Sequence, residues 1–258
     1  MLNSVPNEHL LRIAESYAPK FGIVTSIFLY LAPAKVVWDI ISKSKESTKL
    51  YKFRSNNNKK QKKKISNNSN LDGLNPIPIA IMPCVAISWF IYGLVTSDPY
   101  IIIGNGVGSV LSIAYLIGIL PLMNNSNNNN TVNSNNKQLF WTQMTVLTSS
   151  ITTLGLWSIL GFLTSDTLSK SAVANGAVLG EALGIYASIF FIILCSSPLS
   201  TISKVIKTKN SSSILGQLTI AQCINTTLWS IYGLAVKDRF VYGPNIIVSI
   251  FLQVYVPH

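Results

Sequence analysis

The sequence predicts an all-α membrane protein with seven transmembrane helices, arranged as two parallel three-helix bundles joined by a linker helix. Three observations lead to this fold class. The chain of 258 residues is 48% apolar and only 11% charged, whereas a soluble domain carries about 25% charged residues. It contains several long apolar runs. Residues 89–115 also recur as residues 229–255, with 9 of the 27 aligned positions identical, which indicates two similar half-molecules.

Each apolar run is about as long as the hydrocarbon core of a bilayer requires. The predicted spans are residues 21–41, 77–97, 100–122, 139–163, 175–199, 214–236 and 239–257. Residues 1–20 are polar and charged, so we interpret them as an extracellular or lumenal N-terminus and not as a cleavable signal peptide. Residues 21–122 then form the first bundle, 139–163 the linker helix and 175–257 the second bundle. The linker helix restores the direction of the chain, so the two bundles are parallel.

Two polar segments interrupt this pattern and are predicted to be disordered cytoplasmic loops. Residues 43–75 form an Asn- and Lys-rich insertion in the first bundle, and residues 123–138 are mostly Asn. Ten of the 20 Lys and Arg residues lie between Lys43 and Lys64. The net charge of +11 therefore belongs to one loop and not to a basic folded surface, so a nucleic-acid partner is not expected.

The loop charges also predict the orientation, because Lys and Arg are enriched on the cytoplasmic side. Placing the basic insertion inside leaves 15 basic residues on the cytoplasmic side and 5 on the other. The N-terminus is then outside and the C-terminus cytoplasmic. The three cysteines lie inside predicted spans and the two histidines lie near the chain ends. They suggest neither a disulfide framework nor a metal site, and no cofactor or enzymatic activity is expected.

Several short motifs recur at defined places along the predicted helices. The fifth span contains Ser197-Pro198-Leu199-Ser200 and the third Gly104-Asn105-Gly106. The sixth and seventh spans and their connection contain Trp229 to Leu234, Asp238 and Pro244-Asn245. Together these motifs resemble those of the corresponding helices in the eukaryotic SWEET (MtN3/saliva) family of sugar transporters. The resemblance covers roughly residues 21–122 and 175–257. It implies a facilitative transporter that carries a mono- or disaccharide across the bilayer.

The candidate sugar-binding residues come in pairs at equivalent positions of the two halves. Asn105 and Asn245 can each donate and accept hydrogen bonds, and Trp89 and Trp229 offer flat faces for stacking on a sugar. The resemblance adds Leu29, one turn before Pro33, and these bulky residues favour a hexose. Two alternatives stay open: membrane Asn residues often join helices, and membrane Trp residues often lie at the interface with water.

The resemblance also implies moving parts. Prolines that correspond to the family's cytoplasmic hinges are Pro33, Pro78 and Pro198, whereas the sixth helix lacks one. The side chains that match the family's extracellular gate are Tyr92, Tyr232 and Asp238. An alternative for Asp238 is a solvated loop charge.

The deepest acidic residue, Glu181, falls near the outer end of its predicted span. Proton-driven carriers usually hold an ionisable residue in mid-membrane, so we expect a uniporter that works by alternating access. One alternative is a PQ-loop amino-acid or cystine exporter of an acidic organelle, although the name-giving Pro-Gln pair is absent. Another is a non-transporting membrane receptor or scaffold. We expect a location in the plasma membrane, with the Golgi or endosomal membrane as the alternative, and a homo-oligomer is left open.

Overall fold

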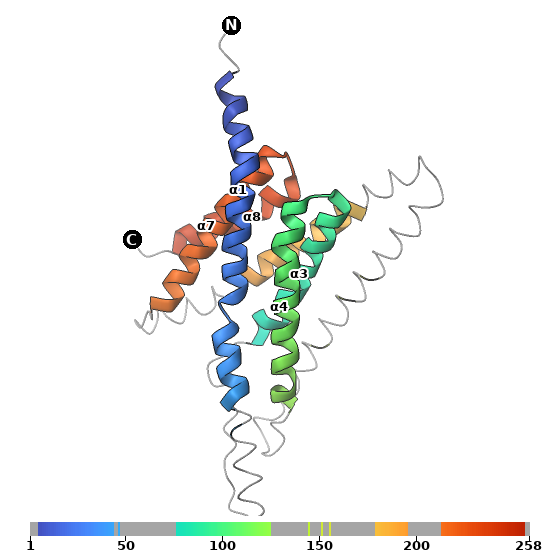
Figure 1. Ribbon diagram of the computed structural model, residues 1–258, viewed down its shortest axis with the longest axis vertical. Helices are drawn as coiled ribbons and strands as arrows, with labels where there is room; N and C mark the ends of the chain where they lie inside the picture. Colours follow the sequence, from blue (N-terminus) through green and yellow to red (C-terminus); the bar gives the residue numbers. More distant parts are fainter. Residues whose placement is uncertain are drawn as a thin grey trace, which may run out of the picture.

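The structure is a computed structural model that describes residues 5–43, 46, 76–124, 144, 151, 155, 179–195 and 213–255. The long helices are α1 (Val5–Leu31), α3 (Pro76–Thr96), α4 (Pro99–Asn124), α7 (Ser213–Ala235) and α8 (Arg239–Tyr255). Two further helices cover residues 34–43 and Leu179–Cys195. In the described ranges the regular structure is entirely helical, and Figure 1 shows α1, α3 and α4 side by side, with α7 crossing behind α1.

Four of the predicted spans agree closely with the helices, namely those over 77–97, 100–122, 214–236 and 239–257. The predicted span over 175–199 corresponds to a helix over Leu179–Cys195. All of the predicted linker helix over 139–163 except residues 144, 151 and 155, together with Pro198 and most of the two polar loops, lies outside the described residues. Their arrangement therefore stays a prediction.

The first helix is longer than predicted, because α1 starts at Val5 and not near residue 21. Its additional turns carry the charges of Glu8, Arg12 and Glu15. A helix satisfies its backbone hydrogen bonds internally, so a charged segment continues as a helix as readily as an apolar one. Hydropathy detects the part of a helix that suits lipid and not the point at which the helix begins. In Figure 1 this part of α1 projects beyond the other helices.

The C-terminal part of the first predicted span is broken at a proline. Ala32 and Pro33 form a turn, after which the chain resumes as the helix over residues 34–43. Proline has no backbone N–H and its ring clashes with the preceding turn of a helix. The carbonyl of Pro33 begins the next helix by accepting from the amide of Val37 at 2.9 Å. The predicted flexible position in this span is thus a real break in the helix.

The described helices pack in a pattern that repeats in the two halves. In the first half α4 packs against both α1 and α3, and in the second α7 packs against α8. Between the halves, α1 packs against α7. The helix Leu179–Cys195 lies against α8, where Gly184 faces Phe240, and against α3, where Gly180 faces Val95. The first helix of each half therefore contacts the second helix of the other half.

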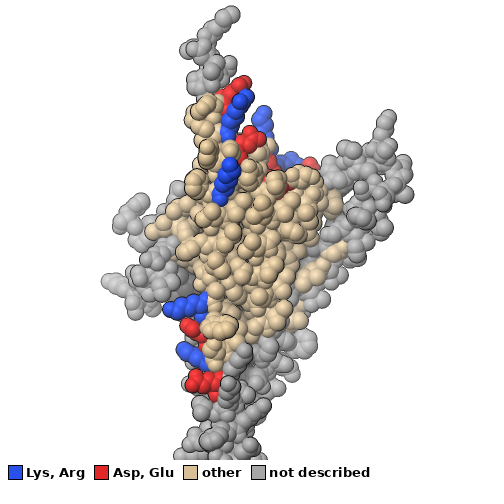
Figure 2. All heavy atoms as spheres, in the orientation of Figure 1, with Lys and Arg blue, Asp and Glu red and all other residues tan. Residues whose placement is uncertain are grey.

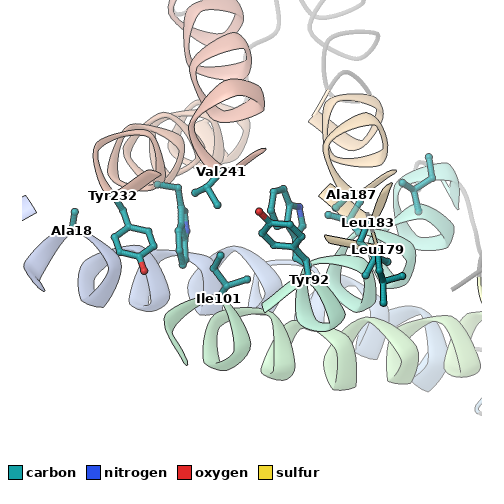
Figure 3. Packing of buried hydrophobic residues seen from close by; sticks show 12 residues of the cluster. Ala18, Tyr92, Ile101, Leu179, Leu183, Ala187, Tyr232 and Val241 are labelled. Carbon is teal, nitrogen blue, oxygen red and sulfur yellow. The ribbon is translucent and has the colours of Figure 1, made fainter. Parts of the chain in front are cut away.

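The largest hydrophobic cluster lies between the two halves and draws on both. Figure 3 shows side chains from α1, α3, α4, α8 and the helix Leu179–Cys195 meeting there. A smaller cluster in the first half joins Val37 to Ile79, Tyr115 and Ile119. The first cluster surrounds the candidate site, and the second lies where the helix over residues 34–43 meets α3 and α4.

The surface has the charge distribution of a membrane protein. In Figure 2 the charged side chains of the described residues gather at the two ends of the molecule, with an uncharged band between them. Within the part of the chain that the structure describes, three helical segments are long and apolar enough to cross a membrane, namely Glu8–Lys43, Pro78–Thr96 and Pro99–Ile119. The helices Leu179–Cys195 and Arg239–Leu252 are shorter and apolar.

Candidate functional site

The two halves turn from their second to their third helix with the same geometry. Ser97 and Lys237 have φ angles of 57° and 59°, the left-handed conformation that commonly ends helices. The next amides, those of Asp98 and Asp238, donate to carbonyls five residues earlier at 2.9 and 2.8 Å. These tight turns bring the start of the third helix directly against the second. A Cβ on Gly233 would come within 2.6 Å of the α8 backbone, so glycine is required there.

The aspartates that follow these turns cap the third helices. One carboxylate oxygen of each, Oδ1, accepts from the backbone amides two and three residues later. The distances are 2.9 and 3.2 Å for Asp98 and 2.9 and 3.3 Å for Asp238. An N-cap of this kind satisfies amides that the helix itself leaves free. It also fixes each carboxylate so that its second oxygen is available to another partner.

That partner is a tyrosine of the opposite half. The Tyr92 hydroxyl donates to Oδ2 of Asp238, and the Tyr232 hydroxyl donates to Oδ2 of Asp98, both at 2.7 Å. Short O–H···O bonds to a carboxylate are among the strong hydrogen bonds in proteins. Each half therefore supplies one donor and one acceptor. The outer ends of α3 and α7 are thus each hydrogen-bonded to the start of the opposite half's third helix.

The structure places the predicted gate residues together and adds a fourth. Tyr92 and Asp238 contact each other as the gate interpretation requires. Tyr232 contacts Asp98, which was not among the predicted gate residues. Asp98 occupies in the first half the position that Asp238 occupies in the second. The repeat was therefore the signal that identifies Asp98.

The paired tryptophans lie directly below these tyrosines, one helical turn away. The Trp89 and Tyr92 rings pack edge to face with centroids 5.4 Å apart, and the Trp229 and Tyr232 rings with centroids 5.9 Å apart. Both indoles are 7% exposed. Tryptophans of the interfacial belt face lipid headgroups, so this burial favours the interior position that sugar stacking needs.

Trp229 is held across the boundary between the halves. Its indole N–H donates to the Ser26 hydroxyl at 3.0 Å, and the Asn225 amide donates to the same oxygen at 2.8 Å. The indole ring lies over two glycines, because a Cβ on Gly22 would stand 3.1 Å from it and one on Gly104 3.5 Å. Small residues on α1 and α4 thus create the space that this ring from α7 fills.

Trp89 has different surroundings. The positions equivalent to Ser26 and Asn225 are Phe191 and Val85, and both belong to the hydrophobic cluster between the halves. Among the described residues, the Trp89 indole makes no hydrogen bond. The α1–α7 contact is consequently joined by hydrogen bonds, whereas its counterpart between α3 and the helix Leu179–Cys195 is apolar.

The paired asparagines have the same orientation within their helices. The side-chain amide of Asn105 donates to the carbonyl of Ile101 at 3.0 Å, and that of Asn245 to the carbonyl of Val241 at 2.7 Å. Each amide retains a second N–H. Asn245 is buried, and the hydrogen bond that the structure describes for its side chain stays within α8. This arrangement argues against a role for Asn245 in joining helices.

The remaining predicted residues lie on helices that could move or face the site. Leu29 is partly buried on α1, one turn before the break at Pro33. Pro78 stands in the first turn of α3 as described, where a missing N–H costs no intrahelical bond. The proline inside α3 is Pro83, which is fully buried. The hinge assignments of Pro33 and Pro78 stay predictions, and Pro198 is not described.

Comparisons with known proteins agree with this arrangement. The profile of a family described as sugar efflux transporters for intercellular exchange (MtN3_slv) matches residues 60–127 and 181–257, together more than half of the chain. These two matches cover much of the two bundles and fall outside the predicted linker helix.

Individual relatives extend over much of the chain. The sugar transporter SWEET1 of Rattus norvegicus is 28% identical over 68% of this chain and 70% of its own length. The bidirectional sugar transporter SWEET1a of Sorghum bicolor is 27% identical over 90% of this chain and 71% of its own length. The fold also resembles that of a eukaryotic SWEET transporter solved at 3.7 Å resolution, with a TM-score of 0.66 and 16% identity. That likeness covers 96% of this chain and 95% of the solved one.

Proposed function

Because the chain belongs to the MtN3/saliva family of sugar efflux transporters, an all-helical family of multi-pass membrane proteins, we propose that it is a facilitative sugar uniporter. It moves a mono- or disaccharide across a membrane by alternating access. The observation that carries this proposal is the reciprocal exchange of hydrogen bonds between Tyr92 and Asp238 and between Tyr232 and Asp98. Two equivalent halves that exchange reversible hydrogen bonds at one end are suited to opening and closing against each other there.

The sugar-binding site comprises Asn105, Asn245, Trp89, Trp229 and Leu29. The two asparagines present the hydrogen-bonding groups that sugar hydroxyls require. Trp229 lies over Gly104 of α4, next to Asn105, and each tryptophan packs against the tyrosine one turn away. Rings of this kind can stack on the apolar face of a sugar. The bulk of these rings supports a hexose as the main substrate.

Tyr92, Tyr232, Asp98 and Asp238 form an extracellular gate, and the two hydrogen bonds between the halves support a closed state of that gate. A hydrogen bond to a charged group contributes about 1.5–3 kcal/mol. Two such bonds therefore stabilise the closed outer side, and the free energy needed to break them is modest.

The cytoplasmic side opens by bending at Pro33 and Pro198, and in α3 either at Pro78, which the sequence predicts, or at Pro83, which lies inside the helix. The break in the first span at Pro33 supports this assignment.

The distribution of acidic residues supports uniport. Asp98 and Asp238 cap helices at the outer end, and Glu181 forms an exposed ion pair with Arg239 at 2.6 Å. None of the carboxylates that the structure describes has the mid-membrane position expected of a proton carrier. The main alternative, proton-linked export of amino acids or cystine from an acidic organelle, lacks that carrier.

We place the protein in the plasma membrane, or alternatively in the Golgi or endosomal membrane, with its N-terminus outside and its C-terminus cytoplasmic. Charged side chains gather at two ends of the described part of the molecule (Figure 2). The first turns of α1 are charged, and Lys35, Asp39 and Lys43 lie on the helix over residues 34–43, which supports a transmembrane orientation set by the basic loop. A homo-oligomer is compatible with this arrangement.

The proposal is tested by uptake of radiolabelled glucose and sucrose in cells that lack their own sugar transporters. Wild type is compared with Asn105→Ala and Asn245→Ala, and with Thr227→Ala, which alters an exposed residue of α7, as the control. We expect saturable uptake by wild type and the control and its loss in both Asn variants. Wild-type rates of sugar uptake in both Asn variants would contradict the proposed binding site. Uptake of cystine but not of sugar would support the amino-acid or cystine exporter. If no solute were transported, the result would support the receptor or scaffold.

A further inference from the structure

A tyrosine on α1 contacts the first-half asparagine from the cytoplasmic side. The Tyr30 hydroxyl donates to Oδ1 of Asn105 in a long hydrogen bond of 3.4 Å. Its ring lies against Gly108 on α4, where any Cβ would overlap it. Its backbone carbonyl, next to the helix break, accepts from the Tyr115 hydroxyl at 3.0 Å. Tyr30 is therefore fixed to α4 through its hydroxyl, its ring and its backbone.

The second half has no such phenol. The position equivalent to Tyr30 is Cys195, whose sulfur accepts a weak hydrogen bond from Gln222 at 3.7 Å. Asn245 nevertheless has the same bond to its own helix that Asn105 has. The phenol is thus not needed to orient an asparagine at this position. What it does provide is a hydroxyl donor for the amide oxygen of Asn105.

That donor has the same chemistry as the substrate. A buried acceptor left without a donor costs about 1–3 kcal/mol. When either side of a carrier is open, water can supply the donor, and when sugar is bound, a sugar hydroxyl can. The exception is the empty carrier at the moment both sides are closed and the site is dry. At that stage Tyr30 is the group positioned to satisfy Asn105.

We propose that the Tyr30 hydroxyl stands in for a substrate hydroxyl at Asn105 while the empty carrier returns across the membrane. This inference rests on the proposed alternating-access function and adds a positioning residue to it. A sugar hydroxyl displaces the phenol on binding, and the phenol returns to Asn105 on release. The two halves consequently differ in the empty state, because only the first supplies its own donor.

The role predicts a specific kinetic signature. Net efflux into sugar-free medium requires the empty carrier to return, whereas exchange of labelled for unlabelled sugar at equal concentrations does not. In Tyr30→Phe, which keeps the ring and removes the hydroxyl, net efflux falls at least about fivefold, because the amide oxygen of Asn105 is left without a donor in the closed, empty carrier. Exchange stays at the wild-type rate. A purely structural loss would slow both processes by the same factor.

Two further variants separate the hydroxyl from the rest of the contact. Gly108→Ala pushes the ring away from α4, because the added methyl takes its place, and it should reproduce the selective loss of net efflux. Tyr115→Phe is the matched control. It removes a hydroxyl that bonds to the Tyr30 backbone but leaves the phenol at Asn105, so any loosening of α1 should affect both fluxes equally.

The experiment uses the purified full-length chain in liposomes, with radiolabelled glucose and sucrose as probes. A ratio of exchange to net efflux that rises in Tyr30→Phe and Gly108→Ala but not in Tyr115→Phe supports the inference. An unchanged ratio in Tyr30→Phe overturns it. If Asn105→Ala then still abolishes both fluxes, the proposed site stands and only the role of Tyr30 fails. If wild type carries neither sugar, the proposed function fails and this inference fails with it.

Discussion

The Tyr232 hydroxyl lies 2.7 Å from Oδ2 of Asp98, in the opposite half of the molecule. Asp98 uses its other oxygen to cap α4, so one side chain both starts a helix and receives a bond from the other bundle. The same relationship exists between Tyr92 and Asp238. The turn geometry that positions each carboxylate is thus linked directly to the hydrogen bond that joins the two halves at this end.

Replacing an aspartate by asparagine separates these two tasks. Asn also caps helices through its oxygen, but its NH2 group only donates, so the tyrosine hydroxyl loses its hydrogen bond to a charged acceptor. We expect Asp98→Asn and Asp238→Asn to fold normally and to shift the carrier toward the outward-open state by at least about tenfold, from the loss of a bond worth about 1.5–3 kcal/mol. Distance measurements between probes on the outer ends of α3 and α7 report this shift. An unchanged distance distribution would show that the pair does not hold the gate.

The reciprocal geometry predicts that the two tyrosines contribute equally. Tyr92→Phe and Tyr232→Phe each remove one bond of 2.7 Å to a capping carboxylate, so each should open the outer side to a similar extent. The double variant should open it further than either single one, because one bond remains in each single variant. Accessibility of an introduced outer-facing cysteine to a membrane-impermeant reagent measures this order. A single variant as open as the double would indicate that one pair alone closes the gate.

Much of this arrangement could be predicted from the repeat in the sequence. Where the sequence-based predictions fail, the failures have physical causes. Periodicity and length locate α3, α4, α7 and α8, because a lipid-facing helix must be apolar over a fixed length. The start of α1 was predicted wrongly, since a charged helix that projects into water leaves no hydropathy signal. The pairing of Asp98 with Tyr232 was missed because contacts between halves depend on how the bundles pack. Ser26 carries no local signal at all, and its importance comes from the two donors that α7 places beside it.

The Ser26 contact predicts an unequal stability of the two inter-half interfaces. Ser26→Ala leaves the buried amide of Asn225 and the indole N–H of Trp229 without their shared acceptor, at a cost of about 1–3 kcal/mol. We expect a clearly lower melting temperature in detergent. Ser188→Ala on the equivalent helix is the matched control, since that hydroxyl bonds only to the carbonyl of Gly184 in its own helix. It should change stability by no more than about 0.5 kcal/mol. Equal losses in the two variants would contradict the assignment.

The prolines differ in what their replacement should do. Pro33→Ala restores an N–H at the break and allows α1 to continue into the helix over residues 34–43, which should stiffen the cytoplasmic end. We therefore expect the maximal flux of sugar to fall several-fold while the half-saturation concentration and the amount of folded protein stay close to wild type. Pro78→Ala, in the first turn of α3, should have little effect, because no helical hydrogen bond is missing there. Pro83→Ala inside α3 tests whether that proline is the functional hinge of its helix. A large loss of flux in Pro78→Ala and none in Pro83→Ala would instead support the hinge that the sequence predicts.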